Sequence, residues 1–314
     1  MKPIMNEIND DPALRDKKKE SVLALLDGWT IEVTPGGAKK IDDFRNYLKS
    51  GTTVFITFLP GSDFEDTIAI ARRLKQEDMH PVPHLAARSI PSESWLKKNL
   101  DRMKSEFELD HVLLIGGGID QPLGEFSDTM QLLDTDLFEH FEVPNIGIAG
   151  HPEGSPDISD DQIKDALAWK NEYAKKTGFN LCITTQFVFE AGAVIDWERR
   201  VRKEGNLLSI RIGIPGIATI KTLLNHARAC GVGPSMRFLT RQAKNVAKLL
   251  QPSSPDALIL DLAKQKITEE SLINGIHVYP LGGLKKSAAW FSAIENGSFD
   301  IEPDKSRMIL SESI

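Results

Sequence analysis

Hydrophobic positions along the chain follow two alternating patterns. Eight short β-rich runs of apolar residues are each followed by a longer stretch in which apolar residues recur every three or four positions. The short runs cover residues 29–33, 53–58, 81–87, 112–115, 145–149, 181–187, 208–214 and 276–279. The amphipathic stretches cover residues 38–48, 64–76, 92–107, 128–140, 160–176, 194–202, 217–230 and 284–294. The pattern therefore predicts eight strand–helix units.

This alternation predicts an α/β fold with a parallel sheet, because a parallel neighbour is reached only through a crossover long enough for a helix. Eight units favour closure into a (β/α)8 TIM-type barrel. An open doubly wound sheet is the alternative, since periodicity alone does not exclude it. We expect residues 1–27 to form an N-terminal helical extension and residues 28–314 one barrel domain. Residues 234–266 are predicted as a helical insertion before the last strand, with helices over 238–250 and 257–264.

Charge and cysteine usage narrow the class of partner. The net charge of −7 argues against nucleic acid, which is bound through clustered lysine and arginine. No apolar run has the length of a membrane span or the form of a signal peptide, so a cytoplasmic protein without a membrane partner is expected. Cys182 and Cys230 lack metal-ligand spacing, so no metal site is predicted.

Candidate chemistry lies where polar residues end apolar runs, because barrel enzymes carry their sites at the carboxyl ends of the strands. Glu32 stands inside the first apolar run, and burial favours the protonated form of a carboxyl group, which suits a general acid. An edge carboxylate paired with Lys39 or Lys40 is the alternative. Thr57 and His84 end the second and third runs, where an ordinary strand threonine and a satisfied core histidine are equally open.

Three further strand ends contain residues suited to ligand contact. After the fourth run, Gly116-Gly117-Gly118 would let backbone approach a ligand and Asp120 would accept hydrogen bonds, although a plain tight loop is also open. Gln121-Pro122 follows, so this is not the dinucleotide fingerprint. The fifth run ends Ala149-Gly150-His151-Pro152-Glu153. In the sixth, Gln186 stands among aromatic residues, where its amide needs either a ligand or neighbouring backbone as partner.

Taken in order, these segments resemble the flavin-dependent methylenetetrahydrofolate reductase family over the catalytic barrel, from about Trp29 onward. The matching segments are Ile31-Glu32-Val33-Thr34-Pro35, Pro83-His84-Leu85, Ala149-Gly150-His151-Pro152-Glu153, Ile183-Thr184-Thr185-Gln186-Phe187-Val188-Phe189, Gly213-Ile214-Pro215 and Gly275-Ile276-His277-Val278-Tyr279. The resemblance implies that Glu32 is the general acid and that Gln186 and Tyr279 contact the folate. It also implies that FAD is bound by Thr57, His84, Gly117, Gly118, Asp120, Ala149, Gly150 and His151.

The chain departs from the family pattern at several positions. The family's Arg-Gly-Asp after the fourth strand is replaced by Gly116-Gly117-Gly118-Ile119-Asp120, so the arginine is absent and Asp120 is shifted by two residues. His151 stands in place of an aromatic residue, and the aromatic residue expected after the seventh strand falls on Thr219. The stacking contribution of that aromatic residue is therefore not predicted here.

The activity implied by the resemblance is reduction of 5,10-methylenetetrahydrofolate to 5-methyltetrahydrofolate, or the reverse oxidation, in the one-carbon metabolism that feeds methionine biosynthesis. FAD is the expected cofactor, NAD(P)H the co-substrate and a folate the small-molecule partner, while assembly into a homo-oligomer stays open. A flavin-free folate enzyme on the same barrel is one alternative. A non-catalytic folate-binding subunit is the other.

Overall fold

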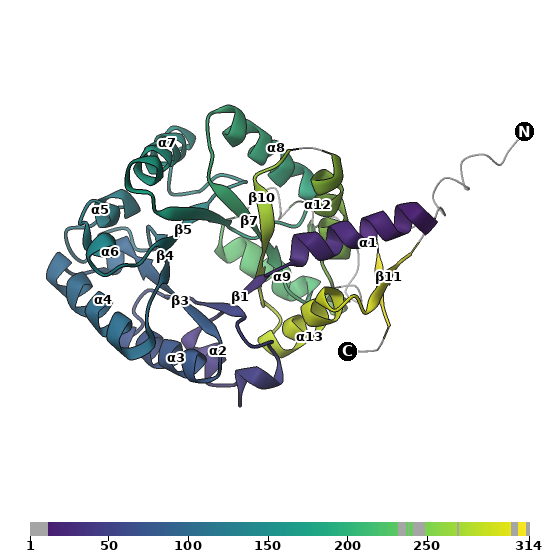
Figure 1. Cartoon of the computed structure of the whole chain (residues 1–314), viewed down its shortest axis with the longest axis horizontal. Coiled ribbons are helices and arrows are strands. Elements are labelled where there is room, and N and C mark those ends of the chain that lie inside the picture. The colour runs from purple at the N-terminus through teal and green to yellow at the C-terminus, as the bar shows by residue number, and fades with distance from the viewer. Residues whose placement is uncertain are drawn as a thin grey trace, which may run out of the picture.

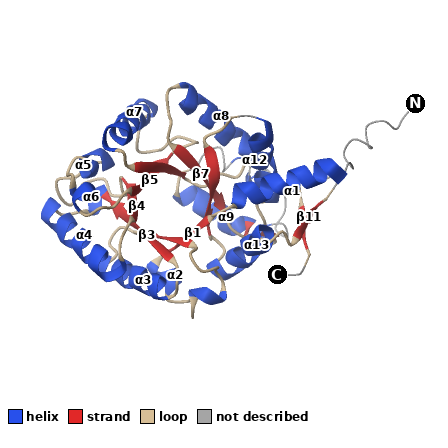
Figure 2. Ribbon diagram, viewed as in Figure 1, coloured by secondary structure: helices blue, strands red, loops and turns tan. Residues whose placement is uncertain are grey.

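The chain forms a closed barrel of eight parallel strands in the order β1-β10-β7-β6-β5-β4-β3-β2. The computed structural model describes residues 12–231, 237, 239–240, 249–268, 270–302 and 307–311. Helices surround the strands on the outside, as Figures 1 and 2 show. The predicted (β/α)8 barrel is therefore confirmed, and the open doubly wound sheet is excluded.

The barrel strands begin and end close to the predicted runs. They are β1 (Thr30–Val33), β2 (Thr53–Ile56), β3 (His80–Ala86), β4 (His111–Ile115), β5 (Asn145–Gly150), β6 (Asn180–Thr185), β7 (Ser209–Pro215) and β10 (Ile273–Tyr279). Side chains alternate between the two faces of each strand. Ile31 and Val33 join the core shared with the outer helices, so Thr30 and Glu32 of the same strand face the barrel interior. By the same alternation His277 and Tyr279 face the interior from β10.

The outer helices bury their apolar faces against the strands. The longer ones are α3 (Phe64–Gln76), α4 (Glu93–Phe107), α7 (Asp160–Thr177), α8 (Ala191–Lys203), α9 (Ile220–Ala229) and α13 (Leu284–Glu295). The helix predicted over residues 64–76 is confirmed at both ends. Ser92 caps α4 as predicted, because its hydroxyl accepts from the N–H of Trp95 at 3.1 Å.

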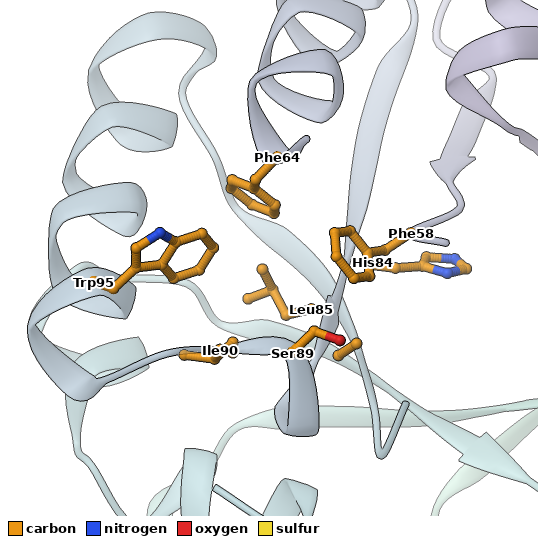
Figure 3. A pocket seen from close by; sticks show the side chains of 8 residues that line it. Phe58, Phe64, His84, Leu85, Ser89, Ile90 and Trp95 are labelled. Carbon is orange, nitrogen blue, oxygen red and sulfur yellow. The ribbon is translucent and has the colours of Figure 1, made fainter. Parts of the chain in front are cut away.

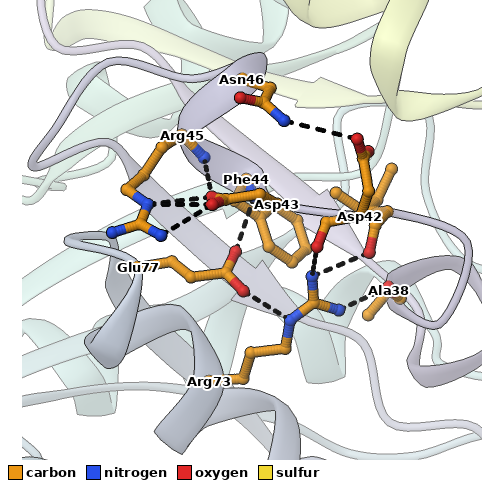
Figure 4. A network of polar contacts seen from close by, with 9 residues as sticks. Ala38, Asp42, Asp43, Phe44, Arg45, Asn46, Arg73 and Glu77 are labelled. Carbon is orange, nitrogen blue, oxygen red and sulfur yellow. Dashed lines mark hydrogen bonds and ion pairs between the residues drawn. The ribbon is translucent and has the colours of Figure 1, made fainter.

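The helix predicted over residues 38–48 is wrong. Two short pieces occupy this region, α2 (Pro35–Ala38) and the 3-10 turn η2 (Phe44–Asn46). Arg73 of α3 donates to three carbonyl oxygens of the intervening chain, and Glu77 accepts from a backbone N–H, as Figure 4 shows. The carbonyls belong to Ala38, Ile41 and Asp42, and the N–H to Phe44. Arg73 of α3 and Glu77 at the C-cap of that helix thus pair with backbone groups that a continuous helix would pair internally.

The single helix predicted over residues 128–140 is also wrong. The region forms two short helices, α5 (Thr129–Leu133) and α6 (Leu137–His140). Asp136 lies between them with a φ of 55°, a left-handed conformation that interrupts helical hydrogen bonding. Asp128 caps α5 through a capping box with Gln131.

Elements outside the eight units gather beside β10. The predicted N-terminal helix is present as α1 (Pro12–Leu26), which packs against α12 (Asp256–Thr268) and α13 (Figure 1). Within the predicted insertion α12 is a helix, whereas most of the helix predicted over 238–250 lies outside the described residues. Two antiparallel pairs were not predicted. They are β8 (Ala218–Thr219) with β9 (Pro252–Ser253), and β11 (Phe299–Ile301) with β12 (Met308–Leu310).

Candidate functional site

Glu32 lies beside His277 at the interior of the barrel. The distance between Oε2 of Glu32 and Nε2 of His277 is 3.6 Å, and the two side chains are 13% and 1% exposed. The other ring nitrogen of His277, Nδ1, is 2.8 Å from the hydroxyl of Thr30. Lys39 pairs with Asp66, at 3.2 Å, and so is not the partner of Glu32 that the edge-carboxylate alternative required. The carboxyl group of Glu32 therefore faces an imidazole rather than a lysine.

Thr57 and His84 present buried polar atoms without partners. Oγ1 of Thr57 and Nε2 of both His84 and His277 are buried and make no hydrogen bond to the described residues. The ring of Phe55 packs edge-on against His84 and His277, with ring centroids 6.0 and 4.6 Å apart. An unpaired buried polar group costs about 1–3 kcal/mol, so such atoms are candidates for contact with a ligand.

Burial lowers the pKa of His84 to about 4, an effect that Glu32 opposes and His277 reinforces. His84 is therefore neutral near pH 7. Burial, followed by the negative charge of Glu32, raises the pKa of Tyr279 well above its usual value. The same two causes raise the pKa of Cys230 at the end of α9. Side chains from β1, β3, β10 and α9 thus share one electrostatic environment around Glu32.

A small apolar pocket with about 10 Å³ of free space adjoins His84. Its lining residues are Phe58, Phe64, His84, Leu85, Ala86, Ser89, Ile90 and Trp95. In Figure 3 Trp95 and Phe64 lie on one side and His84 on the other. That space admits about one water molecule, so this pocket alone does not hold a folate or a flavin.

Tyr279 connects β10 to the end of β6. Its hydroxyl donates to the carbonyl oxygen of Thr185 at 2.9 Å, and its ring lies 4.9 Å from that of His277. Gln186 directly follows Thr185, and its backbone N–H donates to the carbonyl of Gly150. The side-chain oxygen of Gln186 accepts from the N–H of Phe187 at 3.0 Å. This oxygen therefore has neighbouring backbone as its partner, which was the alternative to a ligand. Its amide N–H groups are the donors that it could offer a ligand.

The loop after β4 contains Gly117, Gly118 and Asp120. Gly117 has a φ of 96°, which favours glycine, and both Gly118 and Asp120 are exposed. Arg88, which follows β3, donates to the carbonyls of Ser127 and Ile119 at 3.1 and 3.3 Å. An arginine from the neighbouring strand end thus holds this loop, although the loop lacks the arginine of the family pattern.

The end of β5 places Ala149, Gly150 and His151 beside β6. A Cβ atom on Gly150 would lie 2.5 Å from Ile183 Cγ2, so packing against β6 explains this glycine without a ligand. Burial, followed by the charge of Lys170 on α7, lowers the pKa of His151. Burial lowers the pKa of Lys170 to about 8, partly opposed by Asp128. A half-buried cation therefore lies near His151.

Sequence reasoning missed His277 and Lys170 as candidate site residues. His277 lay in a segment already matched to the family, and its polar character within an apolar strand was the available signal. Lys170 is one of several lysines in residues 160–176, and only the fold shows that it is half-buried near His151. Within the described ranges no cluster of three or more metal-type side chains occurs. Among the helices that the structure describes, none is long and apolar enough to cross a bilayer.

A closed parallel barrel with a carboxyl group and unpaired polar atoms gathered at its interior is typical of barrel enzymes. Residues 39–293 match the sequence profile of the methylenetetrahydrofolate reductase family, and the chain belongs to that family. The matched segment begins after Glu32, so the role of Glu32 rests on its own local resemblance and geometry.

Two similar proteins can be compared with this chain. Methylenetetrahydrofolate reductase 2 of Saccharomyces cerevisiae is 24% identical over 156 residues, which cover 49% of this chain and 25% of the yeast protein. The match thus spans about a quarter of the length of that relative. An uncharacterized protein from Clostridium thermocellum, solved with two copies of 5-methyl-5,6,7,8-tetrahydrofolic acid, superposes with a TM-score of 0.51 at 12% identity. The superposition covers 88% of this chain and 98% of the other, and it shows a shared fold.

Proposed function

We propose that this chain binds FAD at the carboxyl end of the barrel and reduces 5,10-methylenetetrahydrofolate to 5-methyltetrahydrofolate with NAD(P)H, or catalyses the reverse oxidation. The supporting observation is the carboxyl group of Glu32, only 13% exposed, among unpaired polar atoms of Thr57, His84 and His277, in a barrel of this family. The folate bound by the Clostridium thermocellum barrel has the chemistry of the product proposed here. We further propose a cytoplasmic protein without a nucleic-acid or membrane partner.

The residues present fit a flavin in two respects. The unpaired atoms of Thr57 and His84 would gain partners from the polar edge of a ring system, recovering part of the cost of their burial. Lys170 beside His151 offers a cation for the diphosphate, a role for which the family's fourth-strand arginine is absent. Gly117, Gly118, Asp120, Ala149 and Gly150 would contribute backbone and polar contacts around it. When bound, the flavin supplies a two-electron carrier between nicotinamide and folate.

Glu32 is the general acid in this proposal. Opening the five-membered ring of the methylene folate requires a proton on the departing ring nitrogen, and Glu32, which faces the barrel interior beside His277, would deliver it. Gln186 would orient the pterin with its amide N–H groups. Tyr279 would contact the folate from β10, where its hydroxyl is already fixed by Thr185.

The test is made on purified protein reconstituted with FAD. The expected result is a yellow protein with flavin absorbance that oxidises NADH or NADPH anaerobically over many turnovers only when methylenetetrahydrofolate is added. A colourless protein with the same folate-dependent oxidation would instead support the flavin-free alternative. Folate binding without turnover would support the non-catalytic alternative, and neither binding nor turnover would overturn all three.

A further inference from the structure

We infer that His277 is a positioning residue that holds one proton in common with Glu32 and so keeps the acid loaded between turnovers. The catalytic role of this shared proton rests on the proposed function. Nε2 of His277 lies 3.6 Å from the carboxyl group of Glu32. Among the described residues, this nitrogen has no hydrogen-bond partner.

The hydroxyl of Thr30 fixes the opposite side of the imidazole. Nδ1 of His277 lies 2.8 Å from Oγ1 of Thr30, which in turn donates to the carbonyl of Ile276 at 3.5 Å. When the hydroxyl donates to that carbonyl it accepts from Nδ1–H, and the neutral imidazole in this tautomer presents Nε2 as a bare acceptor toward Glu32. Thr30 and His277 are cross-strand partners in the register of β1 and β10, so the barrel itself sets this contact.

The number of protons shared by Glu32 and His277 follows from their facing atoms. If both Nε2 and the carboxyl group were unprotonated, two acceptors would face each other in a buried site, which is unfavourable. One proton satisfies both, whether it resides on the carboxyl group or on Nε2. A movement of the carboxyl group by roughly 0.7 Å would bring the two atoms to the usual N···O hydrogen-bond distance of about 2.9 Å.

The titratable groups around Glu32 and His277 do not take up the proton that the two residues share. His84 faces it from β3 and is neutral near pH 7, because burial lowers its pKa to about 4. Tyr279 of β10 and Cys230 of α9 keep their protons, since burial and the charge of Glu32 raise both pKa values. Phe55 packs against the imidazole from β2 and carries no titratable group. Delivery of the proton to folate would leave the pair one proton short until a proton from solvent replaces it.

The first test needs neither flavin nor turnover. Protein labelled with ¹⁵N-histidine is titrated by NMR as wild type and as Glu32→Gln. We expect the Nε2 resonance of His277 to change in the variant, whereas Nδ1, which faces Thr30, changes little. A His277 spectrum that is indifferent to Glu32→Gln would overturn the inference, whatever the protein's activity. A coupled spectrum in a protein that does not reduce folate would overturn the proposed function alone.

The second test uses two substitutions that each retain one nitrogen position of the imidazole. In His277→Asn the amide nitrogen replaces Nδ1, and in His277→Gln it replaces Nε2. We expect His277→Asn to slow folate reduction roughly 10- to 100-fold, less than the 10²–10⁴-fold worth of a general acid, and to change the pH profile of the rate. His277→Gln should recover part of the rate without the wild-type pH profile. Equal rates and unchanged pH profiles in both variants would show a packing role only.

Discussion

The hydroxyl of Tyr279 donates to the carbonyl oxygen of Thr185 across the intervening strand β7, at a distance of 2.9 Å. The contact passes over Gly213, where an added Cβ atom would lie 2.3 Å from that same carbonyl and 2.7 Å from Tyr279 Cε2. The missing side chain on β7 therefore lets β10 reach the end of β6, next to Gln186.

Gly213→Ala should accordingly displace Tyr279 and lower stability by roughly 1–3 kcal/mol, the usual cost of overpacking. The matched control is Gly192→Ala on α8, where an added Cβ atom meets nothing within 4 Å. The control should be neutral or up to about 1 kcal/mol more stable, because alanine favours helix. Urea denaturation of both variants measures the difference, and an equally stable Gly213→Ala would show that the close approach is not needed.

Lys170→Gln should weaken binding of FAD, because the variant lacks the half-buried cation near His151. We expect the loss to be on the order of tenfold, the worth of about 1.4 kcal/mol for one charged hydrogen bond. Lys175→Gln, an exposed lysine on the same helix, is the control and should bind normally. Fluorescence titration with FAD measures both affinities.

Lys170 also predicts the direction in which FAD binding changes with pH. Since the pKa of Lys170 is lowered to about 8, the ammonium is charged below that pH and loses its proton above it. Affinity of the wild type for FAD should therefore fall as pH rises through about 8, and this step should vanish in Lys170→Gln. A step that persists in the variant would assign it to another group.

Arg73→Met should destabilise the barrel by about 1–3 kcal/mol, because it leaves carbonyl oxygens of the β1–β2 connection without their donor. The adjacent Arg72 pairs with Glu106 on the surface, so Arg72→Met should cost at most about 1 kcal/mol. Thermal or urea unfolding compares the two variants. Equal losses would mean that Arg73 acts only as another surface charge.

Much of the fold could be predicted from hydrophobic spacing because the strands are largely buried on both faces and most of the long helices bury one face. The strand and helix runs of residues 53–76 illustrate this, since their boundaries depend on local patterning and the Asp63 cap. The failures at 38–48 and 128–140 have a different origin. In the first, Arg73 and Glu77 from another helix take the backbone hydrogen bonds, and in the second Asp136 adopts a left-handed conformation.

The candidate site was only partly accessible to sequence. Glu32, Thr57 and His84 could be singled out because each interrupts or ends an apolar run. The contact between Glu32 and His277 joins the first barrel strand to the last. Local hydrophobic spacing does not show that these two strands are neighbours. Similarly, the burial of Lys170 depends on how α7 packs beside the end of β5, which spacing does not report.

The most direct measurement on the central claim compares wild type with Glu32→Gln in two anaerobic half-reactions followed by flavin absorbance. Reduction of the bound flavin by NAD(P)H should be nearly equal in the two proteins, since Glu32 has no part in that step. Reoxidation by methylenetetrahydrofolate should be slower in the variant by on the order of 10² or more, the typical worth of a general acid. An unchanged reoxidation rate in Glu32→Gln would contradict the account.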